Sequence, residues 1–163
     1  RIDGGALEAA VVANRGYIWS LNGIEHTDVI VTAAMQQTQG ASGSAYGLIC
    51  RADERGNGYY FLIASDGTFS IGVATDARNA LFQLVPWQTS SAINHDFRAN
   101  TVRIVCVGDY LALFINDVFV AETFDTEISR GQLGAALGAV GETAWARFDD
   151  IVIQEAYLAA GTR

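Results

Sequence analysis

The fold of this chain is decided by the runs YGLICRAD (46–53), GYYFLIAS (58–65) and TFSIGVAT (68–75). Three similar runs follow after a longer excursion: TVRIVCVG (101–108), YLALFI (110–115) and VFVAETF (118–124). All six are rich in aromatic and β-branched residues, and helical periodicity is hard to find among them. The pattern predicts consecutive antiparallel hairpins, that is, an all-β meander.

The residues between these runs are those that tight hairpins favour. The separators are Asp66-Gly67, Gly108-Asp109, Asn116-Asp117 and the loop RGNG at 55–58. Glycine, asparagine and aspartate tolerate the positive φ that a tight hairpin turn requires. We therefore expect a hairpin turn at each of these places.

Less regular apolar runs predict further strands on both sides of the meander. These runs are residues 7–13, 17–20, 28–36, 81–85, 131–139 and 144–153. The first of them, LEAAVVA, suits a short helix as well. The only proline, Pro86, is expected to end a strand, and the polar segment 88–100 is expected to form a long loop. About a dozen short strands separated by turns are typical of an antiparallel β-sandwich of the jelly-roll type.

Length and charge narrow the class of protein. A chain of 163 residues fits one domain, which we expect to span 1–163 with its core in 6–155. The net charge of -8 repels nucleic-acid phosphates and anionic membranes, so neither is expected as a partner. No apolar run approaches the roughly 20 residues of a membrane helix, so membrane insertion is not expected.

The two ends of the chain suggest a role in assembly. The sequence starts with Arg1 rather than methionine, so we expect a processed mature chain or an excised piece. The run LEAAVVA near the start and the tail AYLAAGTR (156–163) carry little charge, and neither resembles a solvated linker. We expect at least one end to pack on another copy of the chain, by adding a strand to a sheet edge or by filling a groove. A head-to-tail contact of that kind could propagate a fibre.

The two cysteines, Cys50 and Cys106, alternate onto the core side of their strands. They could be buried free thiols or a disulfide. Directly opposed residues on neighbouring antiparallel strands have Cα atoms about 4.5–5.5 Å apart, close to what a disulfide accepts. A metal site is disfavoured, because neither His26 nor His95 has ligand spacing to a cysteine. We favour the disulfide and, with it, an extracellular or cell-surface location.

The acidic residues form no recognisable catalytic pair. A glycosidase needs two carboxyl groups about 5–9.5 Å apart. In FDDIVIQE (148–155), Asp149 and Glu155 share a face but lie about 20 Å apart, and Asp150 is expected to face the other way. No Ser-His-Asp order, Cys-His pair or phosphate loop is visible. We therefore expect no catalytic residues and no enzyme, with a glycoside hydrolase as the less favoured alternative.

No cofactor is expected. The oxygen-bearing positions that a structural calcium ion could use are Asp53, Glu54, Asp96, Asp149 and Asp150. They lack the spacing of an EF-hand loop. Calcium therefore stays a minor alternative, and no metal site is predicted.

The aromatic residues include one candidate for ligand binding. Most tryptophans and tyrosines of such a chain belong to the core, but Trp87 follows a proline and opens the long polar loop. In that loop Asn94, His95 and Asp96 supply hydrogen-bonding groups, and an aromatic face can stack on a sugar ring. We assign these four residues as a candidate ligand-binding site.

Longer motifs resemble a known superfamily. They are YGLICRADERGNGYYFLIASDGTFSIG (46–72), SSAINHD (90–96), ANTVRIVCVGDYLALFINDVFVAE (99–122) and FDDIVI (148–153). In order and spacing they are similar to bacterial extracellular domains of the concanavalin A-like lectin and glucanase superfamily, with its laminin-G-like jelly rolls. The resemblance covers about 28–153 and matches both cysteines, which strengthens the disulfide interpretation. Asp117 replaces the usual glycine, and the glucanase signature Glu-x-Asp-x-x-Glu is absent.

The resemblance implies a secreted or surface-anchored jelly roll, and fold alone does not decide function. Our first hypothesis is a non-catalytic β-sandwich for surface recognition or adhesion that binds a glycan or cell-surface polymer. The alternative is a self-assembling structural subunit of an extracellular filament or surface layer, whose partners are copies of itself.

Overall fold

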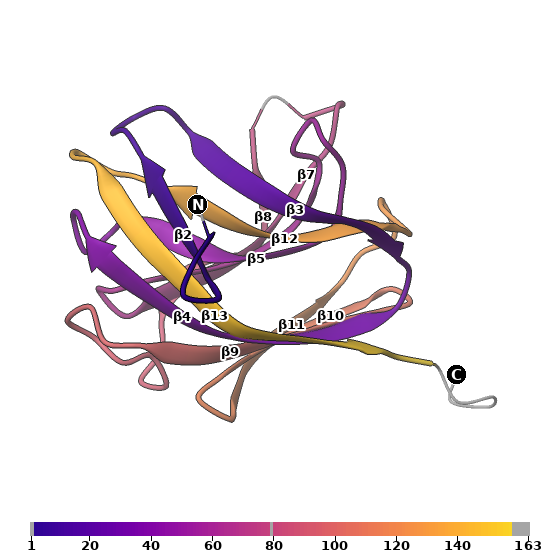
Figure 1. Ribbon diagram of the computed structural model, residues 1–163. Coiled ribbons are helices and arrows are strands. Elements are labelled where there is room, and N and C mark those ends of the chain that lie inside the picture. Colours follow the sequence, from indigo (N-terminus) through magenta and orange to yellow (C-terminus); the bar gives the residue numbers. More distant parts are fainter. Residues whose placement is uncertain (1, 79, 158–163) are drawn as a thin grey trace.

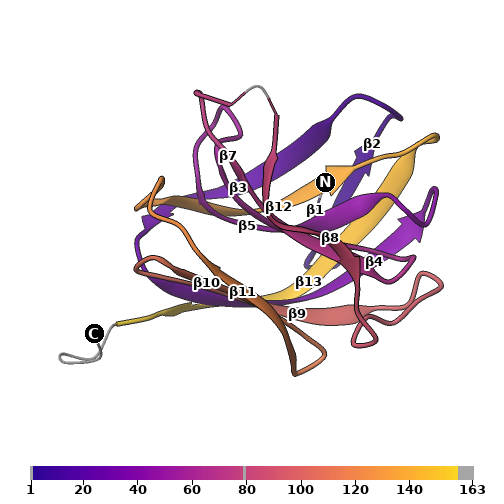
Figure 2. The ribbon, with the colours of Figure 1, turned by 180° about the vertical axis from the view of Figure 1, so that it is seen from behind.

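The computed structural model describes residues 2–78 and 80–157, which form strands and no helix (Figures 1 and 2). The strands make two antiparallel sheets that pack face to face. The predicted fold class, an all-β antiparallel sandwich of the jelly-roll type, is confirmed. No helix in this part of the chain could cross a membrane. The assignment of 1–163 to a single domain stays a prediction.

The first sheet has seven strands in the order β1-β2-β13-β4-β9-β10-β11. They are β1 (Ile2–Asp3), β2 (Ala6–Val11), β13 (Ala144–Glu155), β4 (Val29–Gln39), β9 (Asn100–Val107), β10 (Tyr110–Ile115) and β11 (Val118–Phe124). The second sheet has six strands in the order β3-β12-β5-β6-β7-β8. They are β3 (Tyr17–His26), β12 (Gly131–Gly138), β5 (Ala45–Ala52), β6 (Gly58–Ala64), β7 (Thr68–Ala74) and β8 (Phe82–Thr89).

Each run that was assigned to a strand overlaps one, but several bounds differ: β3 continues to His26 rather than ending at residue 20, and β4 continues to Gln39. LEAAVVA, which suited a helix as well, forms β2, because it pairs with β1 on one edge and with β13 on the other. The expectation that Pro86 ends a strand is wrong, since β8 continues to Thr89. Because β8 is an edge strand with a register shift beside this proline, the missing N–H costs little ladder pairing.

The hairpin turns lie where the sequence predicted them. Asn116 and Asp117 join β10 to β11 with φ values of 51° and 64°, the left-handed geometry of a tight two-residue turn. The tail at 158–163, expected to take part in assembly, lies outside the described residues.

The six-stranded sheet is strongly curved, and its concave face points away from the other sheet. In Figure 1, β3 and the β7–β8 pair rise on either side of β12 and β5. Ile49, Tyr60 and Leu62 belong to an apolar cluster on this face and are at most 3% exposed. Both faces of the central strands are therefore buried, which explains why the sequences of β5 and β6 do not alternate and are apolar apart from Arg51.

The predicted disulfide is present, but its geometry differs from the one expected. Cys50 lies on β5 and Cys106 on β9, so the bond joins the two sheets across the core rather than two neighbouring strands. Their Cα atoms are 6.8 Å apart, wider than a pair of opposed residues within one sheet. Sequence alternation places both thiols in the core correctly, but it does not say which sheet each strand joins.

A buried ionic group lies beside the disulfide. Arg51 is 3% exposed and its guanidinium donates hydrogen bonds to the carbonyls of Thr27 and Ile128 and to Asp28 Oδ1. The same carboxylate oxygen accepts a hydrogen bond from the backbone N–H of Gly108. A buried charge is tolerated only when it is paired and hydrogen-bonded in this way. The group ties three connecting segments to the end of β5.

Replacing both cysteines by alanine should lower the free energy of unfolding by about 4 kcal/mol, because the bond closes a loop with a sequence separation of 56. Chemical denaturation with and without reductant measures this. The oxidised wild type should lose stability in reductant, whereas the double variant should not respond. Two freely alkylated thiols in the native protein would contradict the disulfide.

Gly47 should be intolerant of any side chain. A Cβ at this position would lie 1.9 Å from the backbone oxygen of Phe61, in the neighbouring strand. We expect Gly47→Ala to destabilise the protein by about 3 kcal/mol, since the strands must separate to admit the methyl group. Gly43→Ala is the matched control, because its Cβ would make only an ordinary 3.6 Å contact. Equal thermal midpoints for the two variants would contradict this account.

Candidate functional site

The concave face of the six-stranded sheet contains a small hollow at one end. Tyr17, at the start of β3, and Trp87, on β8, line it from the two flanks of the sheet. Its volume is about 240 Å³, and its other lining residues are Gly16, Gly43, Ala45, Gly138, Ala139 and Val140. The hollow thus combines two aromatic residues with a lining of mostly small residues.

The register of the strands explains why the hollow lies there. Tyr17 pairs with Gly138 of β12, and Gly138 pairs with Ala45 of β5. The two strands next to Tyr17 therefore present only a glycine and an alanine at this level of the sheet. A Cβ at Gly138 would lie 2.7 Å from the Tyr17 ring. The tyrosine ring therefore lies directly on a glycine backbone.

The rest of the concave face is filled by its own side chains. The rings of Tyr17 and Tyr60 have centroids 5.9 Å apart, although three strand spacings separate β3 from β6. Farther along the sheet, the Trp19 indole lies against Gly56 in the loop between β5 and β6. An extended groove along the whole sheet is therefore not available, and the open part is the end between Tyr17 and Trp87.

Polar groups border the hollow. Asp66 Oδ1 accepts hydrogen bonds from the backbone N–H and the hydroxyl of Thr68, which fixes the carboxylate in the β6–β7 turn. A Cβ on the hollow residue Gly43 would lie 3.6 Å from Asp66 Oδ2, so this second oxygen is close by. The Asp66 carboxylate thus offers a hydrogen-bond acceptor at the border of the hollow. The Tyr17 hydroxyl is protonated at neutral pH, as an ordinary tyrosine is, and burial raises its pKa further.

The four residues of the predicted ligand site have different roles. Trp87 lines the hollow, and 37% of it is exposed. The Asn94 side chain donates to the carbonyl of Ala99, inside its own loop. The His95 ring lies against Gly67, where a Cβ would be 2.4 Å from Nε2. Asp96 is an exposed residue of the same loop, with φ of 60°.

Asparagine side chains hold this loop, which spans residues 90–99, in place. Asn100 Oδ1 accepts hydrogen bonds from the backbone N–H of Asn94 and from the Asn116 side chain. Asn116 also donates to the carbonyl of Ala92, so the loop is tied to the β10–β11 turn. The polar character of the segment therefore has a structural explanation, and it positions the residues that follow Trp87.

Sequence reasoning missed Tyr17. A signal for it does exist, because Tyr17, Trp19 and Leu21 alternate along β3 opposite Gly138, Ala136 and Gly134 of β12. When the large residues of one strand lie opposite small residues of its neighbour, the large side chains can lie across that neighbouring strand. The pairing of β3 with β12, more than a hundred residues apart, was not readable from the sequence.

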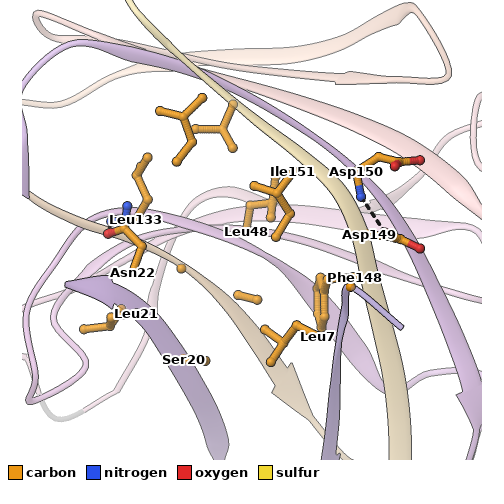
Figure 3. A pocket seen from close by; sticks show the side chains of 15 residues that line it. Leu7, Ser20, Leu21, Asn22, Leu48, Leu133, Phe148, Asp149, Asp150 and Ile151 are labelled. Atoms are coloured by element: carbon orange, nitrogen blue, oxygen red, sulfur yellow. Dashed lines mark hydrogen bonds between the residues drawn. The ribbon is translucent and has the colours of Figure 1, made fainter. Parts of the chain in front are cut away.

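A second, larger hollow opens between the two sheets (Figure 3). Its volume is about 340 Å³, and it lies between β13 and β2 of one sheet and β3 and β12 of the other. We call it the apolar cleft, after its apolar side chains Leu7, Leu21, Val31, Leu48, Leu133, Ala135, Phe148, Ile151 and Ile153.

Asp149 and Asp150 are at the edge of the apolar cleft. The strand bulges here, with a register shift between Asp149 and Val152 and a φ of 50° at Asp150. The expectation that Asp150 simply faces opposite to Asp149 is wrong, because the bulge interrupts the alternation and both residues line the cleft. In Figure 3 their carboxylate oxygens lie on the side of β13 away from Leu7 and Leu48.

The electrostatics of this edge do not favour a general acid. Arg147 donates a hydrogen bond to Asp149 Oδ2 at 3.0 Å, and the backbone N–H of Asp150 donates to Oδ1. These bonds lower the pKa of Asp149, so the group stays ionised at neutral pH. A glycosidase acid needs the opposite shift.

The candidate calcium positions are separate from one another. Asp53 accepts hydrogen bonds from Arg55 and Asn57 in the β5–β6 loop. Burial raises the pKa of Asp53, but these bonds outweigh it and the net shift is downward. Asp96 lies in a different loop, and Asp149 and Asp150 are on β13. Within residues 2–78 and 80–157, no three such groups come together to hold a metal ion.

Known structures share this fold. A carbohydrate-binding module from Bacillus subtilis superposes with a TM-score of 0.74 at 16% identity, over 93% of this chain and 96% of that one. The alginate lyase A1-II′ gives 0.63 at 10% identity, over 94% and 80%. Sheep galectin-11, in a complex with glycerol, gives 0.58 at 6% identity, over 87% and 100%. No protein-family description matches the chain, and no curated protein sequence does.

These likenesses define a class of fold. The chain is a jelly-roll β-sandwich like those of carbohydrate-binding modules, galectins and alginate lyases, which is consistent with the concanavalin A-like fold that the sequence motifs suggested. The class contains both binding proteins and enzymes.

Arg147→Met should raise the pKa of Asp149 toward its ordinary value, because the side-chain hydrogen bond that favours the carboxylate is lost. Titration of the aspartate carboxyl carbons by NMR measures the shift. Arg103→Met is a control, since Arg103 pairs with Asp117 instead. An unchanged Asp149 pKa in the first variant would show that the backbone N–H alone is responsible.

Proposed function

We propose that this protein is a non-catalytic glycan-recognition domain whose binding site is the hollow between Tyr17 and Trp87. The observation that carries the proposal is the pairing of two aromatic side chains above glycine and alanine at the open end of a concave sheet. Aromatic faces stack on the C–H faces of sugars, while the Asp66 carboxylate and the tyrosine hydroxyl can bond sugar hydroxyls.

The fold comparisons support this proposal without deciding it. A carbohydrate-binding module and galectins share the sandwich, although their identities to this chain are 16% or less. At the edge of β13, the hydrogen bond from Arg147 lowers the pKa of Asp149, which argues against a general-acid role for this carboxyl group. The Cys50–Cys106 disulfide supports an extracellular or cell-surface location, where such bonds persist.

The size of the hollow favours a single sugar ring or the end of a chain over a long internal segment. Tyr17 and Tyr60 close the concave face beyond the hollow. Rings stacked farther along the sheet would have to displace the half-buried Tyr17 and the buried Tyr60.

Trp87→Ala should weaken glycan binding at least tenfold, because the stacking face is removed; tenfold corresponds to about 1.4 kcal/mol. A glycan array followed by calorimetry with the best ligand measures this. Trp145→Ala is the matched control, since Trp145 is similarly exposed (41% against 37%) but lies on β13 of the other sheet. Retained binding in Trp87→Ala would remove the proposed site, and an array without any bound glycan would remove the function.

A second candidate function is assembly into a filament or surface layer. It is favoured by the edge strand β11, where Val118, Phe119 and Phe124 are 50–63% exposed. The native mass of the purified protein, measured by light scattering, distinguishes the two. A monomer at all concentrations would contradict assembly and leave glycan recognition alone.

A further inference from the structure

One half of β13 has an unpaired edge. The strand pairs with β4 from Trp145 to Glu155, but on its other side it pairs with β2 only from Ala144 to Phe148. From Asp149 to Glu155, no described strand lies along that side. Because alternate residues of an antiparallel strand direct their N–H and C=O groups to opposite sides, this edge presents free donors and acceptors.

The middle of the same half-strand is apolar, between the acidic residues Asp149 and Asp150 at one end and Glu155 at the other. Ile151, Val152 and Ile153 are 46%, 53% and 39% exposed, and they are consecutive. Edge strands are usually protected by charge, proline or short length, and β8 carries Pro86 and two register shifts. In β13 the bulge at Asp149 precedes the apolar residues and leaves them uncovered.

The unpaired edge borders the apolar cleft. Figure 3 shows Leu48 and Leu7 in the cleft beside β13, with β3 on the far side. One end of the cleft is bounded by Gly5, before β2, and at the other end Glu155 Oε1 bonds to His26 Nδ1 at 2.6 Å. The seven residues from Asp149 to Glu155 span about 23 Å, the length of a short strand. We call this edge and the cleft beside it the β13 slot.

The chemistry of the β13 slot selects its occupant. A hydrocarbon chain would fill the cleft but leave the backbone donors and acceptors unpaired, whereas a peptide strand satisfies both. Its side chains alternate, so every second residue would enter the cleft and the others would face solvent. The net charge of -8 disfavours acidic occupants, including a second copy of this chain.

We propose that the β13 slot binds an extended segment of another protein, with apolar side chains at alternate positions and a net positive charge, by strand addition to β13. The added strand continues the line of β2, so the existing pairing of β2 with β13 sets its position. This site is separate from the Tyr17–Trp87 hollow.

The test uses the full chain and a labelled synthetic peptide, Arg-Ile-Thr-Ile-Thr-Ile-Arg, in fluorescence anisotropy. Ile151→Asp combined with Ile153→Asp should weaken binding at least tenfold, because both residues line the cleft. Val118→Asp makes the same change on the edge strand β11 and should alter binding less than twofold. The same peptide with aspartate at both ends should bind at least fivefold more weakly at low salt.

Hydrogen exchange of the wild-type protein gives a readout that does not depend on the folding of any variant. The peptide should slow the exchange of backbone amides within 151–155. Absence of binding, or protection at 17–26 or 118–124 instead, would overturn the proposal.

Two further measurements distinguish peptide binding at the β13 slot from glycan binding at the hollow and from self-association of the chain. Trp87→Ala should leave peptide binding within twofold of the wild type, so failure of the glycan proposal does not affect this one. If sedimentation shows that the full chain dimerises and that the Ile151→Asp and Ile153→Asp variant is monomeric, the occupant is a second copy and the proposal is overturned.

Discussion

The structure depends on the contact between the inner faces of its two sheets, which the Cys50–Cys106 bond makes covalent. The bond crosses from β5 to β9, the third strand of the six-stranded sheet and the fifth of the seven-stranded one. Next to it, the buried Arg51 draws the segments before β4 and before β12 onto the end of β5. This end of the sandwich is therefore closed by a covalent bond and by an ion pair with its hydrogen bonds.

Closure of the sandwich is uneven, and the apolar cleft follows from that. On one side the edge strands β8 and β11 contact each other. On the other side β13 loses its β2 partner after Phe148, and β3 has a neighbour only in β12, so the sheets separate over the apolar cleft. The concave face has the opposite character, because the curvature of its sheet lets Tyr17 reach Tyr60 and leaves only one end open.

The two proposed sites differ in the interactions they offer a ligand and lie on different parts of the protein surface. The hollow between Tyr17 and Trp87 offers aromatic faces and a few hydrogen-bonding groups, which suits a small hydroxylated ligand. The β13 slot offers an unpaired backbone edge over apolar side chains, which suits an extended peptide. A domain with both could hold a glycan on one face and a protein segment on the other.

The sequence by itself determined most of the strands, the hairpin turns and the core side of both cysteines, and it indicated Trp87 as a candidate ligand-binding residue. These depend on local rules: alternation along a strand, positive φ in tight turns and the composition of apolar runs. Only the tertiary structure decided that the disulfide joins two sheets, that Pro86 lies inside an edge strand and that Tyr17 and Trp87 line the same hollow. Each of these depends on which distant strands become neighbours, as β3 and β12 do. That pairing is set by the burial of whole faces against each other, and no single stretch of sequence contains it.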